Sequence, residues 1–436
     1  MNISAFSARR IRLMERMGNG LAVIPTAPER PRNSDTHHPY RADSYFHYLT
    51  GFGEPEAVLI LIADATPRSI LFCRDKDADK EVWDGFRWGS GAAREAFGCD
   101  EAYSIKTFDE KLAELLAGQP ALWFSIGQDS AWDVRIAAAL NAVRAQVRAG
   151  KQAPTEIRDV RATLDTMRLI KDRAELATMR RAATISAGAH RRAMRATRPG
   201  KQEYEIEAEL LHEFRRHGCQ SPAYSCIVAG GANACILHYV ANDRLLKDGE
   251  LLLIDAGGEL DSYASDITRT FPVGGRFSGP QSDVYSLVLE AQAAAIGAVK
   301  PGATFLDPHS AALKVLVQGM LDLKLLHGSV DGVIESEAYK RFYMHRTSHW
   351  LGLDVHDAGP YKNGEQWRVL QPGMILTVEP GCYIRAASDV PEAFHDIGVR
   401  IEDDALVTES GCEIITHEAP KTIAEIEALM ADGNRG

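Results

Sequence analysis

The chain has 436 residues, more than a single hydrophobic core usually supports, so its length predicts two domains. Its 45% hydrophobic and 25% charged residues are typical of a soluble globular protein, and no apolar run approaches the ~20 residues of a membrane span. The net charge of −11, without a stripe of lysine or arginine, argues against nucleic acid as a partner.

The cysteines and the first residues of the chain predict a cytoplasmic location. Seven cysteines form no C-x-x-C pair, and this odd count suits reduced thiols. Residues 1–20 contain arginines where a signal peptide would need an uninterrupted apolar core. We therefore expect a cytoplasmic protein that does not associate with a membrane.

The amino-terminal third alternates short apolar runs with helical patterns. In chain order, the patterns predict a helix at 7–17, strands at 21–25, 57–63 and 69–74, a helix at 111–117, a strand at 121–126 and a helix at 132–148. A polar stretch at 150–155 and a long helical pattern that begins near Asp172 place the domain boundary at about 150–175. We expect an α/β domain at residues 1–172 and a second domain at 173–436.

The second domain contains a weak internal repeat. A helical pattern at about 172–197 ends at an Arg-Pro-Gly turn and precedes a second helix at 202–217. Another at about 280–299 ends at a Lys-Pro-Gly turn and precedes a helix at 308–326. Proline and glycine stop helices, and both helix pairs lead into strand-like sequence, so we predict two α-α-β-β halves.

Five polar residues interrupt apolar, strand-like runs in this domain. They are Asp255, Asp266, His349, Glu379 and Glu402. An ionised carboxylate buried without a partner is costly, so four of them in such runs indicate cations. Their charge of −4 would be balanced by two divalent ions. We therefore predict a paired-metal hydrolytic site that both halves of the repeat supply.

The neighbours of these residues give further expectations. The ten residues between Asp255 and Asp266 can form a hairpin loop that brings both carboxylates together. Arg400 and Glu402 share one face of a strand, where the arginine can orient the carboxylate. Asp403 and Asp404 are equally consistent with solvated surface.

Most of the fourteen histidines need no special role. His238 and His356 lie in apolar, strand-like sequence, where a core histidine is the usual explanation for either one alone. His345 and His349 have the spacing of two ligands on a helix, but without a glutamate between them they do not form the zincin motif. The histidines expected at the surface are His37, His38, His190, His212, His217 and His417.

Five strings in this order resemble the metal-binding motifs of the pita-bread metallopeptidases, and within that group those of the Xaa-Pro aminopeptidase (aminopeptidase P) family. The strings are LLLIDAGGE, YASDITRTFPV, SHWLGLDVHD, TVEPGCY and VRIEDD. Residues 32–62 also resemble the amino-terminal domain of that family. The resemblance implies an α/β amino-terminal domain followed by an α+β pita-bread catalytic domain with an internal pseudo-twofold repeat.

The resemblance also implies roles for the site residues. The five intruding residues would be the metal ligands, with Asp266 and Glu402 bridging two ions and His349 on one ion only. A water or hydroxide between the ions would attack the peptide carbonyl, and Glu379 would pass on the proton. The resemblance assigns substrate binding and stabilisation of the tetrahedral intermediate to His238 and His356, a supporting position to Arg400, and substrate-side positions to His345 and Tyr361.

The implied activity is removal of the residue before proline at a peptide's amino terminus. A prolidase, which splits Xaa-Pro dipeptides, would share the same ligands, and a pita-bread module that only binds peptides or proteins is an alternative of another class. Oxygen-rich ligation with one imidazole favours manganese, while zinc, cobalt and iron stay open. The family also implies a homo-oligomer, either a dimer or a tetramer.

One departure from the family pattern concerns the residue that follows His345. The family leads us to expect glycine there, but the chain has Arg346, which is larger and charged. No expected metal ligand is affected. The departure therefore bears on substrate preference near that wall of the cleft.

Overall fold

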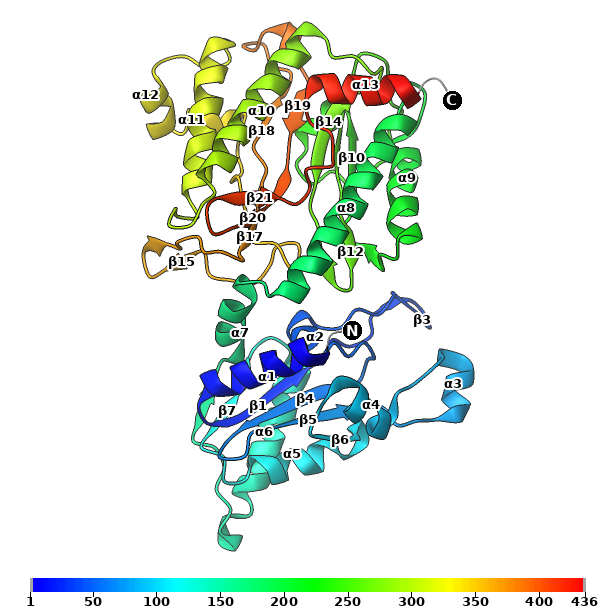
Figure 1. Cartoon of the computed structure of the whole chain (residues 1–436), viewed down its shortest axis with the longest axis vertical. Coiled ribbons are helices and arrows are strands. Elements are labelled where there is room, and N and C mark those ends of the chain that lie inside the picture. Colours follow the sequence, from blue (N-terminus) through cyan, green and yellow to red (C-terminus); the bar gives the residue numbers. More distant parts are fainter. Residues whose placement is uncertain (1–2, 434–436) are drawn as a thin grey trace. The chain divides into compact units, whose positions relative to one another are not determined.

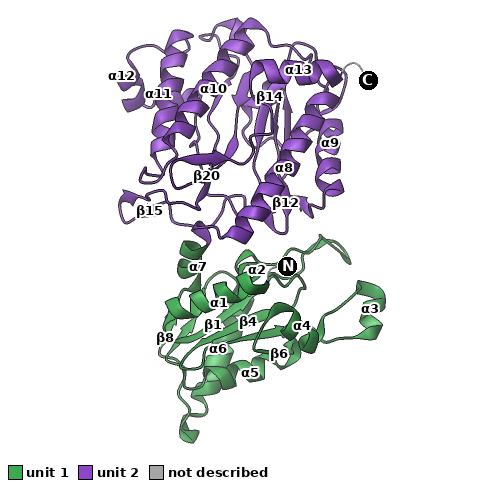
Figure 2. Ribbon diagram, viewed as in Figure 1, with its two compact units in different colours: residues 1–167 green, residues 168–436 purple. Residues whose placement is uncertain are grey.

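The computed structural model describes residues 3–433, which divide between Met167 and Arg168 into two compact units (Figure 2). Unit 1 ends at Met167 and unit 2 begins at Arg168. The division falls inside helix α7 (Val160–Leu169), a helix that the sequence analysis did not expect.

Unit 1 is an α/β domain built on a six-stranded sheet. The strands lie in the order β6-β5-β4-β1-β7-β8. Their bounds are Gly20–Pro25 for β1, Val58–Ala63 for β4, Arg68–Cys73 for β5, Glu101–Ser104 for β6, Ala121–Trp123 for β7 and Glu156–Arg158 for β8. Strand β1 is antiparallel to β4 and parallel to β7. The apolar runs found in the sequence thus form the centre of this mixed sheet.

Helices complete unit 1, most of them packed on this sheet, while α3 stands away from it with no buried residue (Figure 1). They are α1 (Ile3–Met17), α2 (Ser44–Thr50), α3 (Ala78–Asp84), α4 (Gly89–Phe97), α5 (Phe108–Leu116), α6 (Ser130–Arg144) and α7. A short hairpin, β2 (Pro31–Asn33) and β3 (Thr36–His37), precedes α2. The core joins Leu21, Val23, Ile60 and Phe72 of the sheet to Leu112 of α5. The alternating strands and helices explain why this domain could be predicted as α/β.

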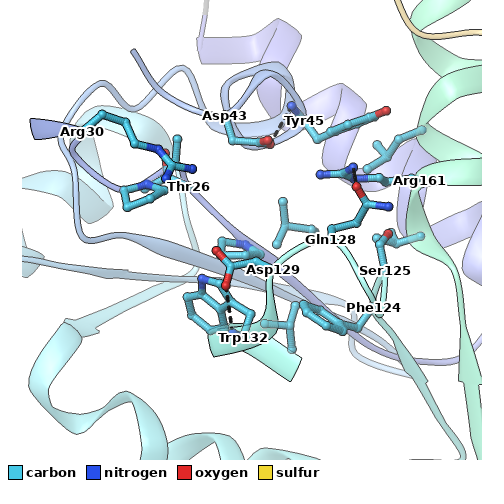
Figure 3. Close-up of a pocket in the computed structure, with 17 residues that line it drawn as sticks. Thr26, Arg30, Asp43, Tyr45, Phe124, Ser125, Gln128, Asp129, Trp132 and Arg161 are labelled. Atoms are coloured by element: carbon cyan, nitrogen blue, oxygen red, sulfur yellow. Dashed lines mark hydrogen bonds between the residues drawn. The ribbon is translucent and has the colours of Figure 1, made fainter. Parts of the chain in front are cut away.

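A cavity of about 210 Å³ lies at the carboxyl ends of the parallel strands β1 and β7 (Figure 3). Trp132 and Phe124 form part of its wall. Several of its polar groups are engaged within the unit, since Asp129 accepts from the first amides of α6 and Arg161 donates to Gln128. The cavity is therefore a feature of the unit 1 packing.

Unit 2 contains two pairs of long helices with strands between them (Figure 1). The first pair is α8 (Arg173–Ala196) and α9 (Glu203–Arg216), and the second is α10 (Gly279–Ala298) and α11 (Asp307–Asp322). Asp172 caps α8 and Ser278 caps α10, each in a capping box. Shorter helices, α12 (Val330–Glu335) and α13 (Ile423–Gly433), follow later in the chain.

Each helix pair is followed by strands that carry predicted ligands. After the first pair come β10 (Ile227–Gly230), β11 (Leu251–Asp255) and β14 (Thr268–Pro272), which form one sheet. After the second pair come the sheet of β17 (Ile375–Val378), β20 (Asp403–Val407) and β21 (Cys412–Ile414), and the ladder of β18 (Gly381–Ile384) with β19 (Ile397–Arg400). This order matches the predicted α-α-β-β halves of a pita-bread domain.

His238 and His356 lie in turns and bends and are exposed, so the strand-like reading of their surroundings was wrong. The apolar residues beside them occupy irregular loops instead. All seven cysteines are free thiols. Within residues 3–433, no helix is both long and apolar enough to cross a membrane.

Candidate metal centre

Asp255 and Asp266 are brought together by the antiparallel strands β11 and β14. Asp255 is the last residue of β11 and pairs with Thr268, two residues beyond Asp266. The chain between them returns through a tight hairpin of β12 (Gly258–Leu260) and β13 (Tyr263–Ala264). Gly257 permits this path, because a Cβ atom there would lie 1.7 Å from the carbonyl oxygen of Ser265.

The other three predicted ligands come from the second half of the repeat. Glu379 follows β17 directly, and Glu402 lies between β19 and β20. His349 lies in an extended segment beside β17, where the Thr377 amide donates to its carbonyl oxygen at 3.0 Å. This segment is not helical, so the spacing of His345 and His349 does not place them on a helix face.

The side chains of these residues converge on one point. Asp266, His349 and Glu402 offer ligand atoms that all lie within 4.8 Å of one another. The His349 Nε2 atom is 3.4 Å from Asp266 Oδ2 and 3.7 Å from Glu379 Oε1. Asp266 and Glu402 are buried, while His349 and Glu379 are half-buried. The group is a candidate site for a metal ion.

Arg400 joins Asp255 to the rest of this group. Its Nη2 atom donates to Asp255 Oδ2 at 2.6 Å, and its Nε atom donates to the Thr268 hydroxyl at 3.1 Å. The Thr268 hydroxyl in turn donates to Glu402 Oε2 at 2.6 Å. The expectation that Arg400 orients Glu402 directly was wrong. Arg400 ends β19 and Glu402 lies in the connection to β20, and the guanidinium is linked to Glu402 through the Thr268 hydroxyl.

Tyr224 is a member of the site that the sequence analysis missed. Its hydroxyl donates to Asp255 Oδ1 at 2.6 Å and also contacts Asp266 Oδ1. The residue precedes β10 in irregular sequence, and a tyrosine there gives no pattern that distinguishes it. Only the fold shows that one phenol serves both carboxylates.

The electrostatics of the group fit a cation. Burial raises the pKa of Asp266 above its ordinary value and raises that of Glu402 well above it, and neighbouring carboxylates add to both effects. Burial raises the pKa of Glu379 to about 7. Burial would lower the pKa of His349, but Asp266 and Glu379 outweigh it and raise the pKa to about 9. Crowded acids that resist ionisation, with one imidazole among them, form a donor set suited to divalent metal ions.

The predicted substrate-side residues surround this group. His356 packs edge-on against His349, with ring centroids 4.3 Å apart. His345 lies within hydrogen-bonding distance of the Tyr383 hydroxyl, with its Nε2 atom at 2.8 Å, and its Nδ1 atom is 3.8 Å from Glu379 Oε2. His238 is near enough to lower the pKa of both His345 and His356, although burial is the larger cause for each.

Tyr361 lies beyond this group, on the aromatic side of the wall. It stacks on Trp350, the residue after His349, at 5.8 Å between ring centroids. It also packs against Phe305 at 4.8 Å.

Asp403 and Asp404 are fully buried, so their reading as solvated surface does not hold. Burial would raise the pKa of Asp403, but Arg269 and Lys421 outweigh it and hold the pKa below its ordinary value. Asp404 Oδ2 accepts from the Asp266 amide at 3.2 Å. The two acids thus stabilise the loops that carry the predicted ligands.

His190 was expected at the surface, but it is fully buried in α8. Its Nε2 atom lies 2.9 Å from the carbonyl oxygen of Ala256, the residue after Asp255. Alanines surround it along α8, and such small residues allow another element to pack closely against the helix.

Comparison with known proteins identifies the family. The model of metallopeptidase family M24 matches residues 177–409, and the model of the aminopeptidase P N-terminal domain matches residues 6–123. The chain belongs to metallopeptidase family M24. Membership confirms the predicted class of enzyme, a metal-dependent hydrolase, and the predicted sequence of an amino-terminal domain and a pita-bread domain.

Relatives of this M24 metallopeptidase match it over nearly its whole length. A Haemophilus influenzae protein named Xaa-Pro aminopeptidase is 46% identical over 98% of the chain and 96% of its own length. A human Xaa-Pro dipeptidase is 32% identical over 98% of the chain and 94% of its own length.

Solved structures of aminopeptidases are also similar to this chain over nearly its whole length. The Pseudomonas aeruginosa aminopeptidase PepP is 49% identical and superposes with a TM-score of 0.98, covering 100% of this chain and 99% of that one. A zinc-substituted Escherichia coli aminopeptidase P in complex with product is 44% identical, with a TM-score of 0.97 and 99% of both chains covered.

Proposed function

We propose that this M24 metallopeptidase removes the amino-terminal residue from peptides that carry proline in the second position. The main support is the 46% identity over 98% of the chain to a protein named Xaa-Pro aminopeptidase. The convergence of Asp266, His349 and Glu402 supports the metal dependence of the reaction.

The metal centre of this proposal lies in residues 173–436, the catalytic domain. Asp255, Asp266, His349, Glu379 and Glu402 would hold two divalent ions, most favourably Mn²⁺. When bound, such ions supply a Lewis acid and lower the pKa of coordinated water. Four carboxylates and one imidazole suit hard or borderline ions, and Zn²⁺, Co²⁺ and Fe²⁺ are the other candidates.

The chain's own residues would bind the substrate and move the proton. Glu379 would take a proton from the attacking water and deliver it to the leaving proline nitrogen. His238 and His356 would hold the peptide and stabilise the oxyanion that develops on its carbonyl group.

Further residues would shape the site around the reacting bond. Arg400 holds Asp255 in place through the 2.6 Å contact, which fixes the direction of that carboxylate. His345 and Tyr361 would line the substrate side of the cleft.

The test compares kcat/KM for Xaa-Pro-Yaa peptides with that for Xaa-Pro dipeptides, in the presence of Mn²⁺. We expect the longer peptides to be strongly preferred. Preference for dipeptides would instead support a prolidase, and absence of both turnover and metal binding would support a module that only binds peptides or proteins.

Replacement of Glu379 by glutamine should abolish cleavage of Xaa-Pro-Yaa peptides. The matched control is Glu409→Gln, which removes an exposed acid and should leave kcat/KM unchanged.

We also propose a cytoplasmic location, because the odd number and the spacing of the seven cysteines suit reduced thiols, and assembly as a dimer or tetramer, by analogy with the family. Analytical ultracentrifugation of the full chain tests the assembly. A purely monomeric protein would contradict it.

A further inference from the structure

Two cations lie against one indole ring at the edge of unit 2. The hairpin of β15 (Lys362–Asn363) and β16 (Gln366–Trp367) pairs Lys362 with Trp367. Lys362 Nζ is 4.6 Å and Arg346 Cζ is 5.1 Å from the centroid of the Trp367 ring. Both cations are exposed, and within residues 3–433 neither forms an ion pair.

Among residues 3–433, no carboxylate lies within ion-pair distance of this pair to offset its charge. Two cations that share one ring repel each other, and a cation–π contact at an exposed site returns only about 0.5–1 kcal/mol. An anion placed between or above them would relieve the repulsion. Arginine in particular presents a planar fork that matches a carboxylate.

Arg346 belongs to the segment that forms one wall of the metal centre. The Glu379 amide donates to the carbonyl oxygen of Thr347, the next residue, at 2.8 Å. On the other side, the Nδ1 atom of His345 lies 3.8 Å from Glu379 Oε2. The backbone of Arg346 is therefore next to the metal centre, while its side chain extends to Trp367.

Trp367 continues this wall toward the predicted substrate-side residue Tyr361. Its ring stacks with Phe305 at 6.4 Å, and Phe305 packs against Tyr361 at 4.8 Å. Lys362 directly follows Tyr361 in the chain. The cation pair thus forms the solvent-facing end of the wall that Tyr361 begins.

We propose that Arg346 and Lys362 bind a carboxylate on the part of the substrate that follows proline. This inference rests on the proposed function. In an aminopeptidase only one residue precedes the reacting bond, so a group at the outer end of the wall meets the residues that leave the cleft. The carboxylate is either an acidic side chain or the free carboxyl terminus of a short peptide.

The experiment measures kcat/KM for matched peptides with Mn²⁺ present. One pair, Xaa-Pro-Glu and Xaa-Pro-Gln in longer amidated peptides, reports on an acidic side chain. A second pair, the tripeptide Xaa-Pro-Gly as free acid and as amide, reports on the carboxyl terminus. We expect the anionic member of at least one pair to be favoured about threefold to tenfold, and the preference to shrink in 0.5 M salt.

Variants assign the preference to the cations. In Arg346→Gly the ratio within the preferred pair should fall to about one, whereas Arg346→Lys should keep part of it. Lys362→Ala should reduce the ratio independently. The matched control is Lys324→Gly, which removes one exposed positive charge at a position where φ is +59° and glycine fits.

The outcomes separate the two proposals. Efficient cleavage of all Xaa-Pro-Yaa peptides without a charge preference, or with a preference that Arg346→Gly leaves intact, overturns this inference alone. Failure of the wild-type protein to cleave any Xaa-Pro-Yaa peptide overturns the proposed function, and the inference with it.

Discussion

The hydroxyl of Tyr224 contacts both Asp255, the last residue of β11, and Asp266, which lies two residues before the paired strand β14. A neutral donor between two acids fixes their directions without adding charge. Arg400 fixes the other oxygen of Asp255, Oδ2, through an ion pair at 2.6 Å. The carboxylates are thereby held in place by their neighbours as well as by their own strands.

Loss of the Tyr224 hydroxyl should weaken metal binding. Groups that orient metal ligands typically contribute 10-fold to 100-fold to affinity, so Tyr224→Phe should raise the Kd for Mn²⁺ by about that factor. Titration of the metal-free protein measures it. Tyr204→Phe, at an exposed tyrosine of α9, is the control. An unchanged Kd in Tyr224→Phe would show that the phenol does not orient the acids.

The predicted ligands could be found in the sequence because each places a charge in an apolar run. Asp255 follows four apolar residues, and Glu379 follows Ile375 to Val378. The roles of Tyr224 and Thr268 could not be predicted from the sequence, because neutral polar residues are common at strand ends. His190 was assigned to the surface because it lies in a helical pattern and is followed by Arg191 and Arg192, whereas its contact with Ala256 depends on tertiary packing.

Among the elements, the close approach at Gly257 positions Asp255 at the end of β11 and Asp266 just before β14. A Cβ atom there would meet the backbone of Ser265, which cannot move as a flexible side chain would. Gly257→Ala should therefore lower the free energy of unfolding by at least about 1–3 kcal/mol. It should also weaken metal binding. Urea unfolding and metal titration measure the two effects.

The control for this substitution is Gly411→Ala. No atom lies within 4 Å of a Cβ built at Gly411, in the turn between β20 and β21, so the free energy of unfolding should change little. Equal effects of the two substitutions would contradict the role given to Gly257.

Long helices and buried strands could be predicted from the sequence because local sequence patterns indicate them. Asp172 with Glu175 and Ser278 with Gln281 form the capping boxes that start α8 and α10. The short α3 and α12 lack a long periodic pattern and were not expected. The loops around His238 and His356 contain apolar residues without forming strands, so composition alone misassigned them.

At the scale of the whole molecule, buried His190 should make stability depend on pH. Burial lowers the pKa of His190 to about 4, well below the value of about 6.5 in an unfolded chain. As pH falls from about 6.5 to about 4, His190 binds a proton in the unfolded state but stays neutral in the folded state. Stability is therefore lost in this window, by about 3 kcal/mol at most from this residue.

Replacement of His190 by glutamine should reduce this loss, because the amide can still donate to Ala256 and does not titrate. Urea unfolding of the metal-free protein at pH 7 and at pH 5 measures the difference between variant and wild type. His212→Gln, at an exposed position of α9, should keep the wild-type dependence. Identical pH profiles for wild type and His190→Gln would contradict the prediction.

We infer that the acidic residues contributed by both halves of unit 2 hold divalent cations that the peptidase reaction needs. Calorimetric titration of metal-free protein with Mn²⁺, with cleavage of an Xaa-Pro-Yaa peptide followed in the same samples, tests it most directly. We predict binding of two ions per chain at micromolar concentration or below, and activity that appears only as they bind. Full activity in the presence of a chelator, or no binding at micromolar Mn²⁺, would contradict the claim.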